Sequence, residues 1–359
     1  SLLPATAQDA NFQEGLQNYF QENYERAREV FTKVAREDTD SARVQFFLGN
    51  TLNRLGDTTG AVNQFRRTLS IQPGHQSARR KLAAILFEAR RWSDAIEEYR
   101  YLVQRNPETY EFHYRLGLAL FKTGALPEAK ERFLRAKRLN SQSADAHYYL
   151  GRILMKNREF LNAASRFSRA LELDPSQGRY YFRRGLAHFR EEDYRSRNDN
   201  SWTSASDFKR AIEEGFDSPK TVFMYANSLL NRGLYYHEND RQTEGVKLLK
   251  RSIRQYRKVL ATDWQASNAF HNMGVAYLVI GKLDHAREAV EKAILTEPST
   301  PFFHDTLGEI YFRMGRFNKA IESWNLAQEL DSGYDTHPFE PMIMERSIPS
   351  RIEESKLRR

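Results

Sequence analysis

The sequence predicts an all-α protein built as a solenoid of antiparallel helix pairs, and three observations carry the prediction. Small residues recur every 34 residues from Gly15 to Gly185. A second small residue follows twelve positions after each of the first five. Apolar residues in each copy take the i, i+3, i+4, i+7 spacing of an amphipathic helix. A chain of 359 residues would otherwise suggest two or three domains. Here the length reflects the number of repeats in one solenoid.

The small residues mark where the two helices of a copy cross, because only Gly or Ala lets two helix backbones approach closely. A large apolar residue four positions after the second small residue is expected to fill the space between neighbouring copies. One helix pair cannot bury its own apolar face, so the copies must stack. The first small residues of the nine copies are Gly15, Gly49, Ala83, Gly117, Gly151, Gly185, Ala226, Gly274 and Gly308.

The period is interrupted in copies six and seven. Copy six carries seven extra, mainly polar residues near 193–200, which predict a loop. Copy seven carries fourteen extra residues near 237–250. Divided between its two helices, they would build a hairpin standing about 10 Å above its neighbours. Insertions on one edge of a solenoid often supply a second contact with a partner, although surface loops also accept insertions without any function.

The two ends of the chain lie outside the repeats, which we place at 8–332. Residues 333–359 are expected to form an extended strap that covers the last copy or enters a groove, because Pro338, Pro341 and Pro349 interrupt a helix. Residues 1–7 read either as the remnant of a signal peptide or as a ragged terminus. Ala5-Thr6-Ala7 resembles a signal cleavage site, which would place the protein in the periplasm or outside the cell; a cytoplasmic location is the alternative.

The repeated pattern resembles the tetratricopeptide repeat family. The residues that carry the resemblance include Leu48-Gly49, Gly56, Ala61, Phe65 and Pro73 in copy two, and the same positions of copy nine from Leu307-Gly308 to Trp324. It covers about residues 8–332. The resemblance implies a right-handed superhelix of nine repeats, whose concave groove is lined by the first helix of each copy and binds a segment of a partner protein.

Composition and motifs do not favour catalysis. The chain has no cysteine, which excludes disulfides, thiolate metal sites and a cysteine nucleophile. It has no metal-binding His-Glu-x-x-His motif, phosphate-binding glycine loop or nucleophile elbow. We therefore expect no enzyme activity, no cofactor and no metal. The net charge of +8 is too small to favour nucleic acid, and no apolar run is long enough to span a membrane.

Fifteen residues on the first helices are expected to line the groove. Apolar side chains outnumber charges among them, and exposed aromatic residues imply that a partner covers them. The alternative is that packing of the superhelix buries some of them. Asn227 and Asn272 match two asparagines of the carboxylate clamp of the chaperone-tail binders, but Phe223, Phe302 and Thr306 stand where that clamp has cations. The groove residues are Arg43, Phe46, Asn50, Arg80, Phe87, Tyr114, Phe121, Tyr148, Arg152, Arg179, Phe182, Phe189, Asn227, His271 and Asn272.

A second candidate surface is a basic stripe in copy seven. Its cations follow helical spacing, so they share one face of the second helix, as in membrane-surface helices and docking sites for acidic partners. A solvated helix face has the same pattern. The stripe consists of Lys247, Lys250, Arg251, Arg254 and Lys258.

The sequence therefore predicts a non-catalytic scaffold that holds one or more proteins, with an acidic surface as one form of partner. If the signal-peptide reading holds, the chain resembles repeat proteins that assemble bacterial envelope machines for secretion, pili or flagella. The alternatives are a cytoplasmic chaperone adaptor and a regulatory subunit of an enzyme on another chain. The sequence does not decide between a monomer and an oligomer.

Overall fold

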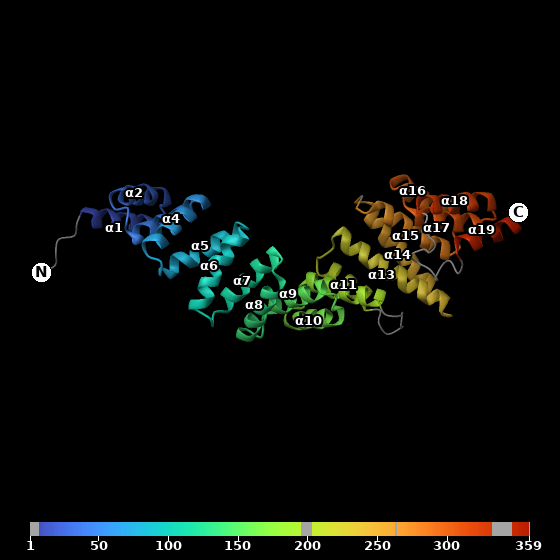
Figure 1. Cartoon of the computed structure of the whole chain (residues 1–359), viewed down its shortest axis with the longest axis horizontal. Coiled ribbons are helices and arrows are strands. Elements are labelled where there is room, and N and C mark those ends of the chain that lie inside the picture. Colours follow the sequence, from blue (N-terminus) through green and yellow to red (C-terminus); the bar gives the residue numbers. More distant parts are fainter. Residues whose placement is uncertain (1–6, 195–202, 263, 332–346, 359) are drawn as a thin grey trace. The chain divides into compact units, whose positions relative to one another are not determined.

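The computed structural model describes residues 7–194, 203–262, 264–331 and 347–358. Within these residues the secondary structure is nineteen helices without a strand, which confirms the prediction of an all-α fold (Figure 1). Within each unit, helices that follow one another in the chain pack as antiparallel pairs, for example α1·α2 in the first unit and α17·α18 in the second. The chain divides into two compact units, Ser1–Ile153 and Leu154–Arg359. The sequence predicted a single solenoid over 8–332 and did not indicate this division, because the 34-residue period continues through it.

The first unit holds four helix pairs, and α9 leads from it into the second. The odd-numbered helix of each pair is the first helix of a repeat and the even-numbered helix is the second. The helices are α1 (Ala7–Phe20), α2 (Tyr24–Glu37), α3 (Ala42–Arg54), α4 (Thr58–Ile71), α5 (Gln76–Glu88), α6 (Trp92–Arg105), α7 (Tyr110–Thr123), α8 (Leu126–Leu139) and α9 (Ala144–Lys156).

The second unit holds the remaining helices, of which α13 and α14 are the longest, at 20 and 19 residues. The helices are α10 (Phe160–Leu173), α11 (Gly178–Tyr194), α12 (Ser204–Glu213), α13 (Pro219–Glu238), α14 (Gln242–Leu260), α15 (Ala266–Val279), α16 (Leu283–Thr296), α17 (Pro301–Arg313), α18 (Phe317–Leu330) and α19 (Ile348–Leu357).

Helix crossings lie at the recurring small residues, as the sequence predicted. A Cβ added to Gly49 would stand 3.0 Å from the ring of Phe65, and one added to Gly308 only 2.4 Å from Trp324 Nε1. Both aromatic side chains are fully buried. The close approach of backbone to ring explains why each copy needs a small residue there, because overpacked cores must shift to accept extra atoms.

The fourteen extra residues of copy seven are divided between α13 and α14. A new crossing forms in the lengthened part, where Gly233 and Gly245 pack backbone against backbone. A Cβ on Gly245 would lie 2.8 Å from the carbonyl oxygen of Gly233 and 2.8 Å from the amide nitrogen of His237. The insertion therefore lengthens the helical hairpin and keeps its packing.

The histidines that recur in one slot of the repeat have a structural role. The Nε2–H of His113 donates to the carbonyl oxygen of Pro107 at 2.9 Å, and that of His304 donates to Pro298 at 2.7 Å. In each case the first helix is tied to the proline that follows the preceding repeat. Burial lowers the pKa of His113, so its imidazole is held in the neutral form.

The C-terminal residues differ from the prediction of an extended strap. Residues 348–357 form α19, and its buried Ile348 and Ile352 join the core of the second unit. Pro349 lies in the first turn, where its fixed φ suits a helix and its missing N–H costs no hydrogen bond. The prediction of an extended chain is thus wrong for this segment. Residues 333–346 of the strap, residues 195–200 of the predicted loop, and Ala5 and Thr6 lie outside the described residues.

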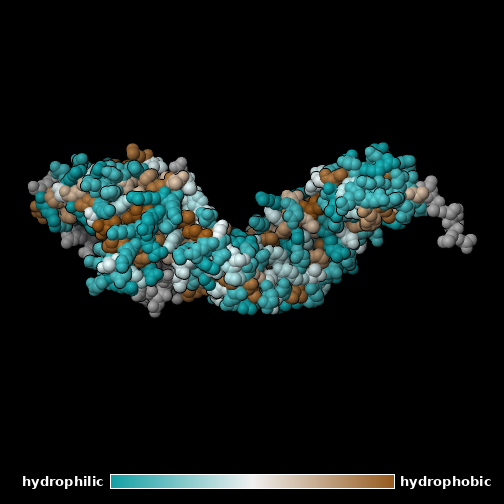
Figure 2. Space-filling model, turned by 180° about the vertical axis from the view of Figure 1, so that it is seen from behind, coloured by the Kyte–Doolittle hydropathy of each residue, from teal (hydrophilic) through white to brown (hydrophobic). Residues whose placement is uncertain are grey.

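None of the helices in the described part of the chain is long and apolar enough to cross a membrane. Hydrophilic side chains cover much of the face in Figure 2, with smaller hydrophobic patches among them.

Candidate partner-binding surfaces

The predicted groove aromatics of the first unit lie against one another more closely than the sequence suggested. Phe121 and Tyr148 are only 6% and 5% exposed, so the expectation that they face water is wrong. Tyr149, which the sequence analysis missed, explains this burial. Its ring lies 5.5 Å from that of Phe121 and stacks on Phe133 at 5.2 Å. The sequence offers one signal for this packing, because Tyr149 directly follows the predicted groove residue Tyr148.

The other predicted aromatics of the first unit are half-buried and join neighbouring repeats. Phe46 packs against Phe65 and His75, with centroid distances of 5.9 and 4.8 Å. Phe87 lies 6.1 Å from Tyr99 in its own repeat, and the guanidinium of Arg115 in the next repeat lies 5.2 Å from the centre of the Phe87 ring. These side chains contribute to the stacking of repeats, and only part of each ring is open to a partner. Asn50 is buried, while Phe46, Phe87 and Tyr114 are half-buried.

The predicted cations of the first unit keep their charge at the surface. The guanidinium of Arg43 lies 4.1 Å from the centre of the Phe12 ring, and that of Arg152 lies 4.6 Å from the Phe121 ring. Arg43 and Arg80 are exposed and Arg152 is half-buried. Stacking on a ring orients a guanidinium and leaves its N–H groups able to donate.

The predicted groove residues of the second unit are also unequal in exposure. His271 is only 1% exposed and Phe182 only 4%, so neither can meet a partner without movement of its surroundings. Phe189, Asn227 and Asn272 are half-buried. The guanidinium of Arg179, half-buried as well, lies 5.1 Å from the ring of Tyr180.

Asn227 on α13 and Asn272 on α15 contact each other between two adjacent repeats. The amide Nδ2 of Asn272 donates to Asn227 Oδ1 at 3.1 Å, and the hydroxyl of Tyr256 donates to the same oxygen at 2.7 Å. Two donors on one oxygen fix the orientation of the Asn227 amide. Among the described residues, no acceptor takes a hydrogen bond from Asn227 Nδ2.

His271 extends this polar network into the next repeat. Its Nδ1–H donates to Asn272 Oδ1 at 3.1 Å, and its Nε2 lies 2.9 Å from Thr306 Oγ1. Burial lowers the pKa of His271 to about 4, so the ring is neutral at neutral pH. The network thus joins α13, α14, α15 and α17, and fixes the first helices of three repeats.

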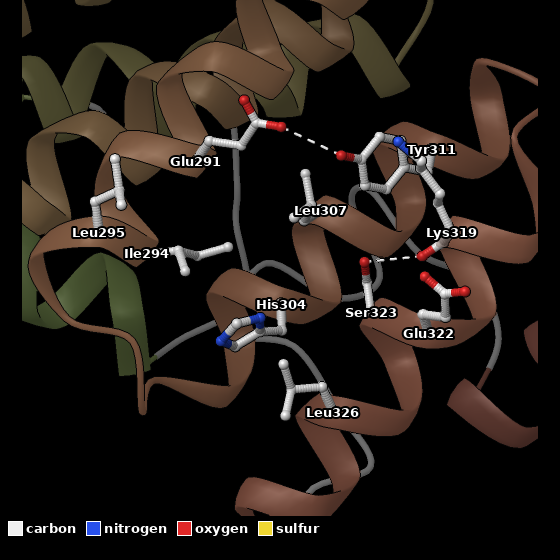
Figure 3. A pocket seen from close by; sticks show the side chains of 10 residues that line it. All are labelled: Glu291, Ile294, Leu295, His304, Leu307, Tyr311, Lys319, Glu322, Ser323 and Leu326. Atoms are coloured by element: carbon white, nitrogen blue, oxygen red, sulfur yellow. Dashed lines mark hydrogen bonds between the residues drawn. The ribbon is translucent and has the colours of Figure 1, made fainter.

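A separate open pocket of about 610 Å³ lies among α16, α17 and α18 (Figure 3). Its lining is mainly apolar and includes Leu295, which is 83% exposed, and Leu326. The hydroxyl of Tyr311 donates to Glu291 at 3.2 Å on one side of the pocket. The described residues hold no cluster of three or more His, Asp or Glu that could bind a metal. This lining suits an apolar side chain of another protein.

Sequence comparison decides the family. Models described as the tetratricopeptide repeat match residues 12–76, 80–144, 148–195, 224–294 and 304–334. The chain belongs to the tetratricopeptide repeat family. No curated protein sequence matches the chain.

Solved tetratricopeptide repeat structures resemble about half of this chain. A double mutant of MamA from RS-1 is 24% identical over 48% of this chain and 97% of its own, with a TM-score of 0.43. MamA residues 41 to the end, from Desulfovibrio magneticus RS-1, are 23% identical over 49% and 99%, with a TM-score of 0.43. YrrB, described as a tetratricopeptide repeat protein with an unusual peptide-binding site, is 20% identical over 54% and 95%, with a TM-score of 0.44.

At three described positions of the second unit's tetratricopeptide repeats, other residues stand where a carboxylate clamp has cations. Phe223 is buried, and Phe302 packs against the ring of His271 at 5.0 Å. Thr306 is fully buried beside the same histidine. These three described positions therefore give the half-buried asparagines no basic side chain that would hold a chain-terminal carboxylate.

The basic stripe lies on the second helix of repeat seven. Lys247, Lys250, Arg254 and Lys258 are exposed. Arg251 is half-buried, and its Nη2 donates to the hydroxyl of Tyr225 at 2.7 Å. Four of the five predicted cations are therefore directed away from the packed side of α14.

Proposed function

We propose that this tetratricopeptide repeat chain is a non-catalytic scaffold that binds a segment of a partner protein along the first helices of its repeats. The proposal rests mainly on the side-chain amide of Asn227. Its oxygen is held by Tyr256 and Asn272, and its NH₂ group is left to donate. A fixed amide of this kind suits the main-chain carbonyl of an extended segment.

The cations of the first unit support the same proposal. Arg80 is exposed on α5, and the guanidinium of Arg152 is oriented by the rings of Phe121 and Tyr148. Guanidinium groups form strong, directed hydrogen bonds to carboxylates and carbonyl oxygens. We expect each unit to contribute its own contacts.

We propose more specifically that the scaffold takes part in the assembly of a bacterial envelope machine. It rests on the Ala5-Thr6-Ala7 pattern, which would place the protein in the periplasm. Fractionation of native cells tests it, and recovery of the full chain with cytoplasmic proteins would contradict it. No observation favours the alternatives of a cytoplasmic chaperone adaptor or a regulatory subunit; the missing clamp cations argue against the adaptor.

Site-specific photo-crosslinking in native cells tests the scaffold proposal. A photoreactive residue replaces Arg80, Arg152 or Lys220 on first helices, and in matched controls replaces Lys33, Lys130 or Asn325 on second helices. We expect mass spectrometry to find the same partner at several first-helix positions. A partner captured only by the second-helix controls would contradict the proposal.

A further inference from the structure

The outer face of α14 is strongly and uniformly basic. At 100° per residue, all six cations of the helix fall within an arc of about 120°. The buried residues, among them Leu249 and Tyr256, occupy the opposite arc. Glu244 is the only acidic residue of α14. The helix therefore turns one charged side outward and one apolar side toward α13 and α15.

Two of the six cations are engaged by neighbouring first helices. Arg251 donates to the hydroxyl of Tyr225 at 2.7 Å, and Arg257 donates to that of Tyr277 at 2.8 Å. A neutral phenol does not compensate a charge. These contacts fix the edges of the face, and between them Lys247, Lys250, Arg254 and Lys258 form a row about 16 Å long.

The row lacks the carboxylate partners that other second helices of this unit provide. Arg169 pairs with Glu172 on α10, Lys209 with Glu213 on α12, and Arg287 with Glu291 on α16. No described residue forms an ion pair with any of the four cations in the row. Like charges three and four residues apart repel each other, so the row destabilises α14 in the free chain. An acidic partner would remove that repulsion.

The shape of the row favours a protein partner over a membrane or a nucleic acid. None of the large exposed hydrophobic side chains of the described residues lies on α14, so nothing beside the cations would enter a bilayer. The row is one residue wide, and its cations lie three or four residues apart. Carboxylates with the same spacing share one face of a helix, so an acidic helix can match the row.

We propose that the outer face of α14 is a docking site for an acidic helix of a partner protein, whose carboxylates lie along Lys247, Lys250, Arg254 and Lys258. This site is distinct from the first-helix face, because it lies on the second helix of the repeat. The scaffold would then hold a partner by two surfaces, and binding at α14 would weaken steeply with salt.

Fluorescence anisotropy with two labelled peptides tests the proposal on the full chain. One helix-forming peptide carries four glutamates spaced three, four and four residues apart. The other has the same composition, but its glutamates point in different directions around the helix. We expect the full chain to bind the matched peptide about tenfold more tightly at low salt.

Two sets of variants locate the binding. Replacing Lys247, Lys250, Arg254 and Lys258 by Gln should abolish the preference for the matched peptide and leave the thermal midpoint unchanged or slightly higher. Replacing the exposed Lys33, Arg36, Lys130 and Arg138 by Gln removes the same charge from α2 and α8 and should preserve the preference.

Three results would overturn the proposal: equal affinity for both peptides, retention of the preference in the α14 variant, or tighter binding of the α14 row to phosphatidylserine vesicles or duplex DNA than to the matched peptide. Crosslinks at the first-helix positions do not depend on this outcome, so the two binding surfaces are tested separately.

Discussion

Arg351 on α19 and Asp305 on α17 form a buried ion pair, with Arg351 Nη1 2.8 Å from Asp305 Oδ1 and side-chain exposures of 6% and 0%. The guanidinium of Arg351 also lies 5.1 Å from the centre of the Trp324 ring. Trp324 is the residue that fills the crossing at Gly308. The C-terminal helix is thereby tied to both helices of the last repeat, and covers an end that a solenoid would otherwise leave open.

Replacing Arg351 by Met should loosen the last repeat. The variant leaves the Asp305 carboxylate buried without its cation, which costs about 3–5 kcal/mol in comparable pairs. We expect faster hydrogen exchange throughout α17, α18 and α19. Arg358→Met at the end of this helix is the control, because the Arg358 side chain is 57% exposed where it pairs with Glu354, and its loss should change stability by less than about 1 kcal/mol. Unchanged exchange in Arg351→Met would contradict this role.

A methyl group at Gly245 should disrupt the lengthened hairpin. The new Cβ would meet main-chain atoms of Gly233 and His237, which cannot move aside as a flexible side chain can. We expect Gly245→Ala to destabilise the second unit by about 1–3 kcal/mol in urea unfolding. Gly74→Ala, where a Cβ meets nothing within 4 Å, should change stability by less than about 0.5 kcal/mol. Similar effects from both variants would show that α13 and α14 do not pack closely there.

His271 should make the second unit less stable in acid. Its folded pKa of about 4 lies below the value of about 6.5 in an unfolded chain, so the unfolded state binds more protons between these values. The free energy of unfolding should fall as the pH is lowered from about 6.5 to about 4. His271→Gln should be less stable than the wild type at pH 7, with a difference that shrinks toward pH 4. Parallel stability curves would contradict the assignment.

The repeats themselves were predictable because local spacing determines them. The interval from Gly49 to Phe65 places a small residue against a large ring on the paired helix, and the structure has that contact. His113 and His304 occupy the same position of two repeats, and both side chains donate to a proline carbonyl six residues earlier.

Burial and polar pairing across repeats were harder to predict. Asn227 and Asn272 are 45 residues apart, and copy seven departs from the period between them, so no fixed interval predicted their hydrogen bond. Phe121 was expected in water because the repeat spacing does not show how closely the next first helix packs. The sequence does not predict the helical C-terminus, because Pro349 breaks a helix in most positions but is favourable in the first turn, where it lies in α19.

The most direct test of the account is the affinity of Asn227→Asp for the partner segment recovered by crosslinking. Aspartate keeps the oxygen that accepts from Tyr256 and Asn272 but removes the NH₂ donor, so the fold should persist while a main-chain carbonyl is repelled. Asn325→Asp on the exposed side of α18 adds the same charge away from the first helices. Calorimetry should show a loss of about tenfold or more for Asn227→Asp and less than about twofold for Asn325→Asp. Equal affinity of the two folded variants would contradict binding along the first helices.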